Sequence, residues 1–285
     1  MRSLSVLFLS PYNKKYPLRA IFRFIYWKVI KLFRLNNVTY HLWGNRKINL
    51  YHNSFQCMWL MYNYLVDFEE FNLIQDYVKP GDHVADVGAN MGYYTIWMSK
   101  FISSGGSIHS FEPNEANYKL LINNCALNKL QNTVFNKIAL SDRTGNVLFT
   151  KSLDGENHIA LSSNADTSSI ACTTLDEYAS EKNITHFSYI KVDIEGFEID
   201  FIKGAEELLK NTKIDIIQLE INERVSNSMT TKEMLLNKIA ELDYMLCKYD
   251  VATKQLVETN YNNERENYFM VSSLALVNKR LIGGK

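Results

Sequence analysis

Acidic residues are absent from the first 66 positions of this 285-residue sequence, although the whole chain carries no net charge. That segment holds ten of the 31 Lys and Arg residues, so the remainder is acidic on balance. Between positions 18 and 35, cations alternate with apolar and aromatic side chains, as in a basic amphipathic helix. We expect residues 14–35 either to contact an anionic membrane or a phosphate-bearing substrate, or to pack on the rest of the chain with the lysines in water.

Cysteine is scarce as well, with four residues and no C-x-x-C spacing, which argues against a zinc site and against a disulfide framework. No apolar run approaches the roughly 18 residues of a membrane span, and the short one before Pro11 is a poor signal peptide. We therefore predict a cytoplasmic protein, and if its basic segment contacts a membrane, the contact is expected to be peripheral and at the inner membrane face. Residues 1–66 are interpreted as a basic, aromatic-rich extension and residues 67–285 as the main domain.

Strand-like and helix-like patterns alternate from residue 83 onward. Strands are predicted at 83–88, 107–112, 133–138, 187–193, 214–221, 244–249 and 268–276, and helices at 92–101, 115–127, 198–210 and 230–241. Such alternation predicts an α/β fold with a parallel sheet and helices on both faces. Between 141 and 178 the alternation stops, and two short strand candidates, 146–150 and 169–174, flank a polar loop that we interpret as a ribbon beside the site.

The stretch "HVADVGANMGYYT" joins a buried strand to a helix through three residues that tolerate unusual backbone angles, Gly88, Asn90 and Gly92. We expect the turn to leave backbone N–H groups free for an anionic group of a ligand. The pyrophosphate pattern G-x-G-x-x-G is missing, and the carboxylate of Asp86 would sit poorly beside a pyrophosphate. Asp86 suits instead the amino group of a methionine-like moiety.

Glu112 ends the next predicted strand, and Pro113 stops that strand. A carboxylate at this place accepts hydrogen bonds from the two hydroxyls of a ribose, which predicts a nucleoside-containing ligand. Together with Asp86 and the turn, this favours S-adenosylmethionine over a dinucleotide.

Carboxylates also follow the fourth predicted strand, where a base is expected to accept a proton from the substrate. Asp193 and Glu195 share a face if the chain stays extended, and either could be that base. His158, in the polar loop, is the other candidate base. With Glu220 the two carboxylates could ligate a divalent ion such as Mg²⁺, but carboxylates at strand ends are common without ions, so no metal is expected.

Four ordered blocks, "VADVGANMGYYT", "SFEPNEANYKLLINN", "ALSDRTG" and "YIKVDIEGFEIDFIKGA", resemble the FkbM family of S-adenosylmethionine-dependent methyltransferases over roughly residues 80–222. The resemblance implies a Rossmann-like, seven-stranded class I methyltransferase sheet, mostly parallel, with an antiparallel last strand at 268–276. It also implies methyl transfer to a hydroxyl of a sugar, glycan precursor or secondary metabolite. In the matching blocks, the family's methionine contacts fall on Asp86, Gly88, Asn90 and Gly92, its ribose contact on Glu112, and its adenine contacts on Ala139 and Leu140.

Three other functions are alternatives to this one. A nicotinamide-dependent oxidoreductase would share the strand–Gly–helix arrangement and Glu112, but its glycine pattern is missing. A nucleic-acid methyltransferase is disfavoured because the fourth strand ends in "DIEG" and the whole chain is not basic, so no nucleic-acid partner is expected. A membrane-associated binding module of the same fold would lack activity, which the complete set of cofactor blocks argues against.

Overall fold

The structure is a computed structural model that describes residues 7–8, 10–65, 67–150, 167–221, 232–262 and 265–283. The chain divides into two compact units, Met1–Asn72 and Leu73–Lys285. Across the described ranges, none of the helices has the length and apolar composition that a bilayer crossing requires. The cysteines Cys57, Cys125, Cys172 and Cys247 are all buried free thiols.

The first unit is built from short helices and one antiparallel strand pair. Its elements are α1 (Pro11–Lys15), α2 (Pro17–Leu32), β1 (Val38–His41), η2 (Trp43–Asn45), β2 (Lys47–Leu50) and α3 (Phe55–Asn63), while α4 (Phe68–Tyr77) runs across the boundary. Helix α2 forms where the basic amphipathic pattern predicted a helix, and it begins with Pro17, whose fixed φ suits the first helical position. The packed face of α2 carries Ala20, Arg23, Trp27 and Ile30.

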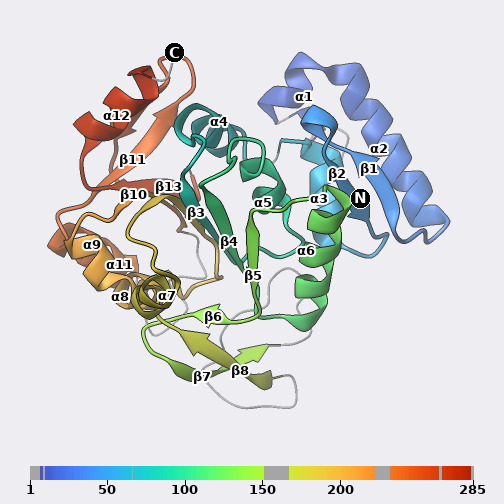
Figure 1. Cartoon of the computed structure of the whole chain (residues 1–285). Helices are drawn as coiled ribbons and strands as arrows, with labels where there is room; N and C mark the ends of the chain where they lie inside the picture. Colours follow the sequence, from blue (N-terminus) through green and yellow to red (C-terminus); the bar gives the residue numbers. More distant parts are fainter. Residues whose placement is uncertain are drawn as a thin grey trace. The chain divides into compact units, whose positions relative to one another are not determined.

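The second unit contains an eight-stranded sheet with the order β12-β11-β13-β10-β9-β3-β4-β5 (Figure 1). These strands are β3 (His83–Val87), β4 (Ser107–Phe111), β5 (Thr133–Asn136), β9 (Phe187–Val192), β10 (Ile214–Glu220), β11 (Met245–Asp250), β12 (Gln255–Glu258) and β13 (Asn267–Val271). The five strands β5, β4, β3, β9 and β10 are mutually parallel, whereas β13 is antiparallel to both of its neighbours. The predicted α/β class and mostly parallel sheet are confirmed.

The order of the strands reverses between β3 and β9. The chain leaves β3 toward β4 and β5 on one side, then returns to β9 on the other side of β3. In open α/β sheets ligands bind beyond the carboxyl ends of the strands at this switch point. The ends of β3 and β9 pair in register, with Asp86 opposite Lys191 and Val87 opposite Val192.

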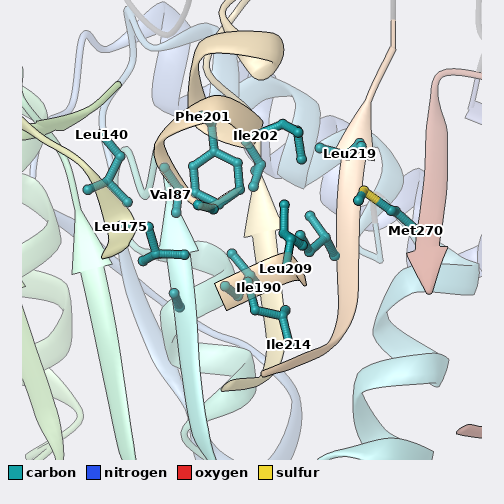
Figure 2. Packing of buried hydrophobic residues seen from close by; sticks show 14 of the residues in the cluster. Val87, Leu140, Leu175, Ile190, Phe201, Ile202, Leu209, Ile214, Leu219 and Met270 are labelled. Atoms are coloured by element: carbon teal, nitrogen blue, oxygen red, sulfur yellow. The ribbon is translucent and has the colours of Figure 1, made fainter. Parts of the chain in front are cut away.

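Helices cover both faces of this sheet. They are α5 (Tyr93–Met98), α6 (Glu115–Leu127), α7 (Leu175–Lys182), α8 (Glu198–Gly204), α9 (Glu206–Lys210), α11 (Lys232–Glu241) and α12 (Leu274–Gly283). An apolar cluster joins the sheet to α7, α8, α9 and α11, and Figure 2 shows Phe201, Ile202 and Leu209 packed over the strand residues. On the other face, Tyr94 of α5 accepts a hydrogen bond from Gln218 of β10 at 3.0 Å.

A separate three-stranded sheet, ordered β6-β8-β7, follows β5. It consists of β6 (Ala139–Leu140), β7 (Gly145–Thr150) and β8 (Thr167–Thr173), and β7 pairs antiparallel with β8. The predicted ribbon is therefore present. The polar loop between its strands, 151–166, lies outside the described residues, and His158 lies there with it.

Three sequence-based boundaries and counts were wrong. The last strand, predicted as 268–276, ends at Val271, and α12 begins at Leu274 because Ser273 caps it, with its Oγ accepting from the Leu276 N–H at 3.5 Å. The helix predicted over 198–210 is two helices that meet at Ala205. The sheet has eight strands rather than seven, because β12 pairs with the outer edge of β11.

Candidate functional site

The turn after β3 is held by its own glycines. Gly88, Asn90 and Gly92 all have positive φ, at 77°, 48° and 88°. Gly88 also lies so close to the β9–α8 turn that a Cβ there would collide with the carbonyl oxygen of Asp193. Only glycine combines this backbone angle with this approach. The two loops at the switch point therefore touch through their main chains.

The amides of the turn are mostly used within the fold. The N–H groups of Gly88 and Ala89 both donate to the Phe111 carbonyl, at 3.0 and 2.9 Å, and the Gly92 N–H donates to the Ala89 carbonyl at 2.8 Å. The Asn90 N–H donates to Oε2 of Glu112 at 2.8 Å. The prediction that the turn leaves its N–H groups free for an anion is wrong for these four donors, because the turn needs them to hold its own shape.

Asp86 lies at the carboxyl end of β3 and is fully buried. Its Oδ2 accepts a hydrogen bond from the Thr95 hydroxyl at 2.6 Å, while Oδ1 has no hydrogen-bond partner in the described part of the chain. Burial raises the pKa of this carboxyl, against the opposing effects of Lys191 and Thr95. An unsatisfied buried carboxylate oxygen is costly, so this atom is ready to take a donor from a ligand.

Glu112 follows β4 and is 4% exposed, so it is not an exposed strand-end carboxylate. Its Oε2 accepts from the Asn90 N–H and its Oε1 from the Asn114 N–H, each at 2.8 Å. Burial raises the pKa of Glu112 to about 7, and the two backbone hydrogen bonds act in the opposite direction. A carboxylate has about four acceptor sites, so each oxygen keeps one for a further donor such as a hydroxyl.

Lys191 joins the two loops at the switch point from the end of β9. Its Nζ donates to the Gly88 carbonyl at 3.1 Å and to Oδ2 of Asp193 at 3.0 Å. It also lies 3.9 Å from Oδ1 of Asp86. Burial lowers the pKa of this lysine, but the two carboxylates outweigh burial and raise it. Lys191 is therefore a buried cation that fixes Asp193 beside the glycine turn.

The chain is not extended beyond Asp193. Strand β9 ends at Val192, and Glu195 and Gly196 have φ values of 55° and 101°. Asp193 and Glu195 would share a strand face only in an extended chain, so they do not share one here. The side chain of Glu198 stabilises this turn, because its Oε1 accepts from the Gly196 N–H at 3.2 Å.

Glu198 is itself a perturbed acid, only 1% exposed. Burial raises its pKa to about 7, with backbone hydrogen bonds opposing that rise and Asp193 adding to it. Its Oε2 has no hydrogen-bond partner among the described residues. Glu198 thus begins α8 without capping it and binds the turn that carries Asp193.

The remaining predicted site residues in the described ranges are Glu220, at the end of β10, and Ala139 and Leu140, in β6. Glu220 ends β10, next to β9. In the described ranges, no group of three or more His, Cys, Asp and Glu residues could hold a metal ion, and Asp193, Glu195 and Glu220 do not form one. Ala139 and Leu140 form β6, where both side chains are buried in apolar clusters, so their proposed contact with adenine would have to come from an exposed edge or the backbone.

Lys191, Thr95 and Gln218 are not among the site residues predicted from the sequence. Lysine within the apolar run "YIKV" is a usable signal, because lysine is almost never fully buried unless it is paired. Thr95 and Gln218 gave no such signal. They matter because Thr95 bonds Asp86, and Gln218 links Tyr189 of β9, at 2.7 Å, to Tyr94 of α5.

Comparison with known proteins gives the following matches. The family model of the methyltransferase FkbM domain matches residues 86–249. The hexuronic acid methyltransferase AglP of Haloferax volcanii is 23% identical over 167 residues, which is 58% of this chain and 67% of that protein.

Solved structures match as well, among them the following two. Methyltransferase FkbM from Methylobacillus flagellatus has a TM-score of 0.43 and 16% identity, over 67% of this chain and 44% of that one, so the chain spans less than half of it. An S-adenosylmethionine-dependent O-methyltransferase from Thermotoga maritima has a TM-score of 0.42 and 12% identity, over 82% and 76%. Because the family model matches more than half of its length, the chain belongs to the FkbM family of S-adenosylmethionine-dependent methyltransferases, as the four sequence blocks predicted.

Proposed function

We propose that this protein transfers a methyl group from S-adenosylmethionine to a hydroxyl oxygen of a sugar, glycan precursor or secondary metabolite. The observation that carries the proposal is the placement of Asp86 and Glu112 at the carboxyl ends of two adjacent parallel strands, beside the switch point, with the glycine turn between them. The proposal divides the chain into a basic extension, 1–66, and a methyltransferase domain, 67–285.

The two carboxylates fit the two ends of this cofactor. The Oδ1 of Asp86, which has no hydrogen-bond partner among the described residues, suits an ammonium group, and the spare acceptor sites of Glu112 suit ribose hydroxyls. The same buried Asp86 would be unfavourable beside the pyrophosphate of a nicotinamide dinucleotide. The oxidoreductase alternative shares the strand–Gly–helix arrangement and Glu112 with this proposal, but Asp86 counts against it.

When bound, the cofactor supplies an electrophilic methyl group, so the chain has to align an acceptor and take its proton. We assign this task to the segment that carries Asp193 and Glu195, with His158 as the alternative base. Asp193 is suited to it by position, because Lys191 holds its carboxylate at the switch point while its side chain stays 35% exposed. Lys191 is a positioning residue in this scheme.

A sugar acceptor is supported by the sequence similarity to a hexuronic acid methyltransferase. The basic segment 14–35 supports an anionic acceptor or an anionic place of work, such as a lipid-linked or phosphate-bearing saccharide at a membrane surface. These two features together define the acceptors to try first: uronic acids and phosphorylated or lipid-linked saccharides.

Calorimetric titration with S-adenosylhomocysteine and with NAD⁺ tests the cofactor. We expect only S-adenosylhomocysteine to bind, and Glu112→Ala to weaken it at least about tenfold, the effect of one or more lost hydrogen bonds to a charged group. Glu115→Ala is the matched control, since Glu115 is an exposed carboxylate three positions away whose partners are Lys119 and Lys137. Binding of NAD⁺, or equal affinities of the Glu112 and Glu115 variants, would contradict the proposal.

A further inference from the structure

Helix α2 buries a charged side chain and exposes a row of large apolar side chains. Its packed face contains a cation, Arg23, which is 3% exposed, while large apolar side chains point to solvent. The exposed apolar side chains, called here the apolar row, are Leu18, Ile21, Phe22, Ile25, Val29 and Leu32. An α-helix turns about 100° per residue, so the row occupies an arc of about 100° along the full length of α2. Leu18 and Leu32, at its two ends, are 81% and 76% exposed.

This orientation is fixed by the buried side of the helix. The Arg23 guanidinium donates to the Met61 carbonyl of α3 at 3.3 Å and to Oδ1 of Asn13. It also lies 4.9 Å from the centre of the Tyr64 ring. Rolling the helix to hide the apolar row would break these contacts and leave a buried charge without partners. The exposed row is therefore imposed by the packing of the unit.

Cations line the apolar row on both sides. By helical geometry Arg19 falls beside one edge of the row and Lys28 beside the other, and Lys31 lies beyond Lys28. All three are exposed, and none of them pairs with a carboxylate within the described residues. No acidic residue occurs anywhere in positions 1–66 to compensate them.

We propose that α2 lies in the surface of an anionic membrane, with the apolar row among the acyl chains and the flanking cations at the lipid headgroups. An apolar stripe bordered by lysine and arginine is the arrangement of helices that bind in the membrane interface. A second copy of the chain fits this face less well, because a symmetric contact would bring the same cations together without an acid between them. The inference rests on the membrane contact in the proposed function, but not on methyl transfer.

Co-sedimentation of the full chain with vesicles tests this inference. We expect binding to phosphatidylglycerol vesicles and little binding to phosphatidylcholine vesicles. Each cation near an anionic surface contributes about fivefold to partitioning, so Arg19→Gln with Lys28→Gln and Lys31→Gln should weaken binding about a hundredfold. Leu18→Ser with Phe22→Ser and Ile25→Ser should reduce binding by at least that factor, because the buried apolar area is lost.

Matched controls come from the second unit. Lys129→Gln with Lys213→Gln and Lys248→Gln removes three exposed charges, and Leu276→Ser with Ile282→Ser removes two exposed apolar side chains, so both sets should bind as the unchanged protein does. Circular dichroism checks that every variant is folded.

Two results would overturn the inference: no binding to phosphatidylglycerol, or a lipid-free dimer that the apolar-row substitutions dissociate. Titration with S-adenosylhomocysteine in the absence of lipid tests the proposed cofactor separately from membrane binding. The apolar-row variants should bind S-adenosylhomocysteine with the affinity of the unchanged protein, whether or not α2 binds lipid.

Discussion

At the scale of single residues, Gly88 is constrained by two independent features, its positive φ and its approach to the Asp193 carbonyl. We predict that Gly88→Ala lowers the free energy of unfolding by about 3 kcal/mol, because the turn after β3 and the β9–α8 turn must separate. Gly81→Ala is the control: Gly81 also has a positive φ, 88°, but no atom lies near its missing Cβ, so it should cost only about 1 kcal/mol. Urea denaturation followed by circular dichroism measures both, and equal losses would show that the close approach is unimportant.

The raised pKa of Glu198 makes the stability of the protein depend on pH. Its pKa is raised to about 7, so the folded state binds the proton more tightly than the unfolded state does, and the native protein loses stability as pH rises from about 4.5 to 7. Glu198→Gln removes this loss. Its stability relative to the unchanged protein should therefore increase between pH 5 and pH 8, by on the order of 3 kcal/mol.

Denaturant titrations of both proteins at pH 5 and pH 8 measure this change. Glu115→Gln serves as the control, because the pKa of Glu115 is lowered by its hydrogen bonds from Lys137 and Lys119. If the free energies of unfolding of Glu198→Gln and of the unchanged protein instead differ by the same amount at both pH values, Glu198 is already ionised throughout this range.

At the scale of elements, one cation, Lys191, links the turn after β3 to the turn after β9. We predict that Lys191→Met lowers the free energy of unfolding by about 3 kcal/mol or more at pH 8, because Asp86 is left buried and charged without compensation. The loss should be smaller at pH 5, since a buried carboxyl with no cation beside it takes up a proton more readily. Unfolding curves of Lys191→Met and of the unchanged protein at the two pH values measure this loss of free energy. A loss that is the same at both pH values would show that Lys191 acts through packing rather than through its charge.

Lys203→Met supplies the comparison for that measurement. Lys203 also pairs with an aspartate, Asp200, at 3.8 Å, but its side chain is 42% exposed. An exposed pair contributes little, so this substitution should change stability by less than about 1 kcal/mol.

At the scale of the whole molecule, cofactor binding should stabilise the folded chain by mass action. S-adenosylhomocysteine at a hundredfold excess over its Kd should raise the free energy of unfolding by about 2.7 kcal/mol, and NAD⁺ at the same concentration should not. Differential scanning calorimetry detects this as a shift of Tm. Glu112→Ala should shift less at the same ligand concentration, and a shift produced by NAD⁺ alone would count against the assigned cofactor.

The elements of the second unit were readable in the sequence because its strands are apolar runs between glycine, proline and polar residues. The run "HVADV" and the change to a helical pattern after Gly92 located β3 and α5, and Glu112 followed from its place after the next strand. The helix α12 was missed because "VSSLALV" is as apolar as a strand, and the cap at Ser273 was not recognised.

By itself the sequence determined the class of the fold, the position of the glycine turn and the family, since each follows from local patterns and from their order along the chain. Tertiary structure decided what those residues contact. Lys191 bonds the Gly88 carbonyl, 103 positions away, and the turn amides are used by Phe111 and Glu112 rather than left free. The apolar row of α2 faces solvent because Arg23 reaches Met61 of α3. Hydrogen bonds and buried contacts between distant segments leave no periodic pattern in the sequence. They can therefore be identified only in the tertiary structure.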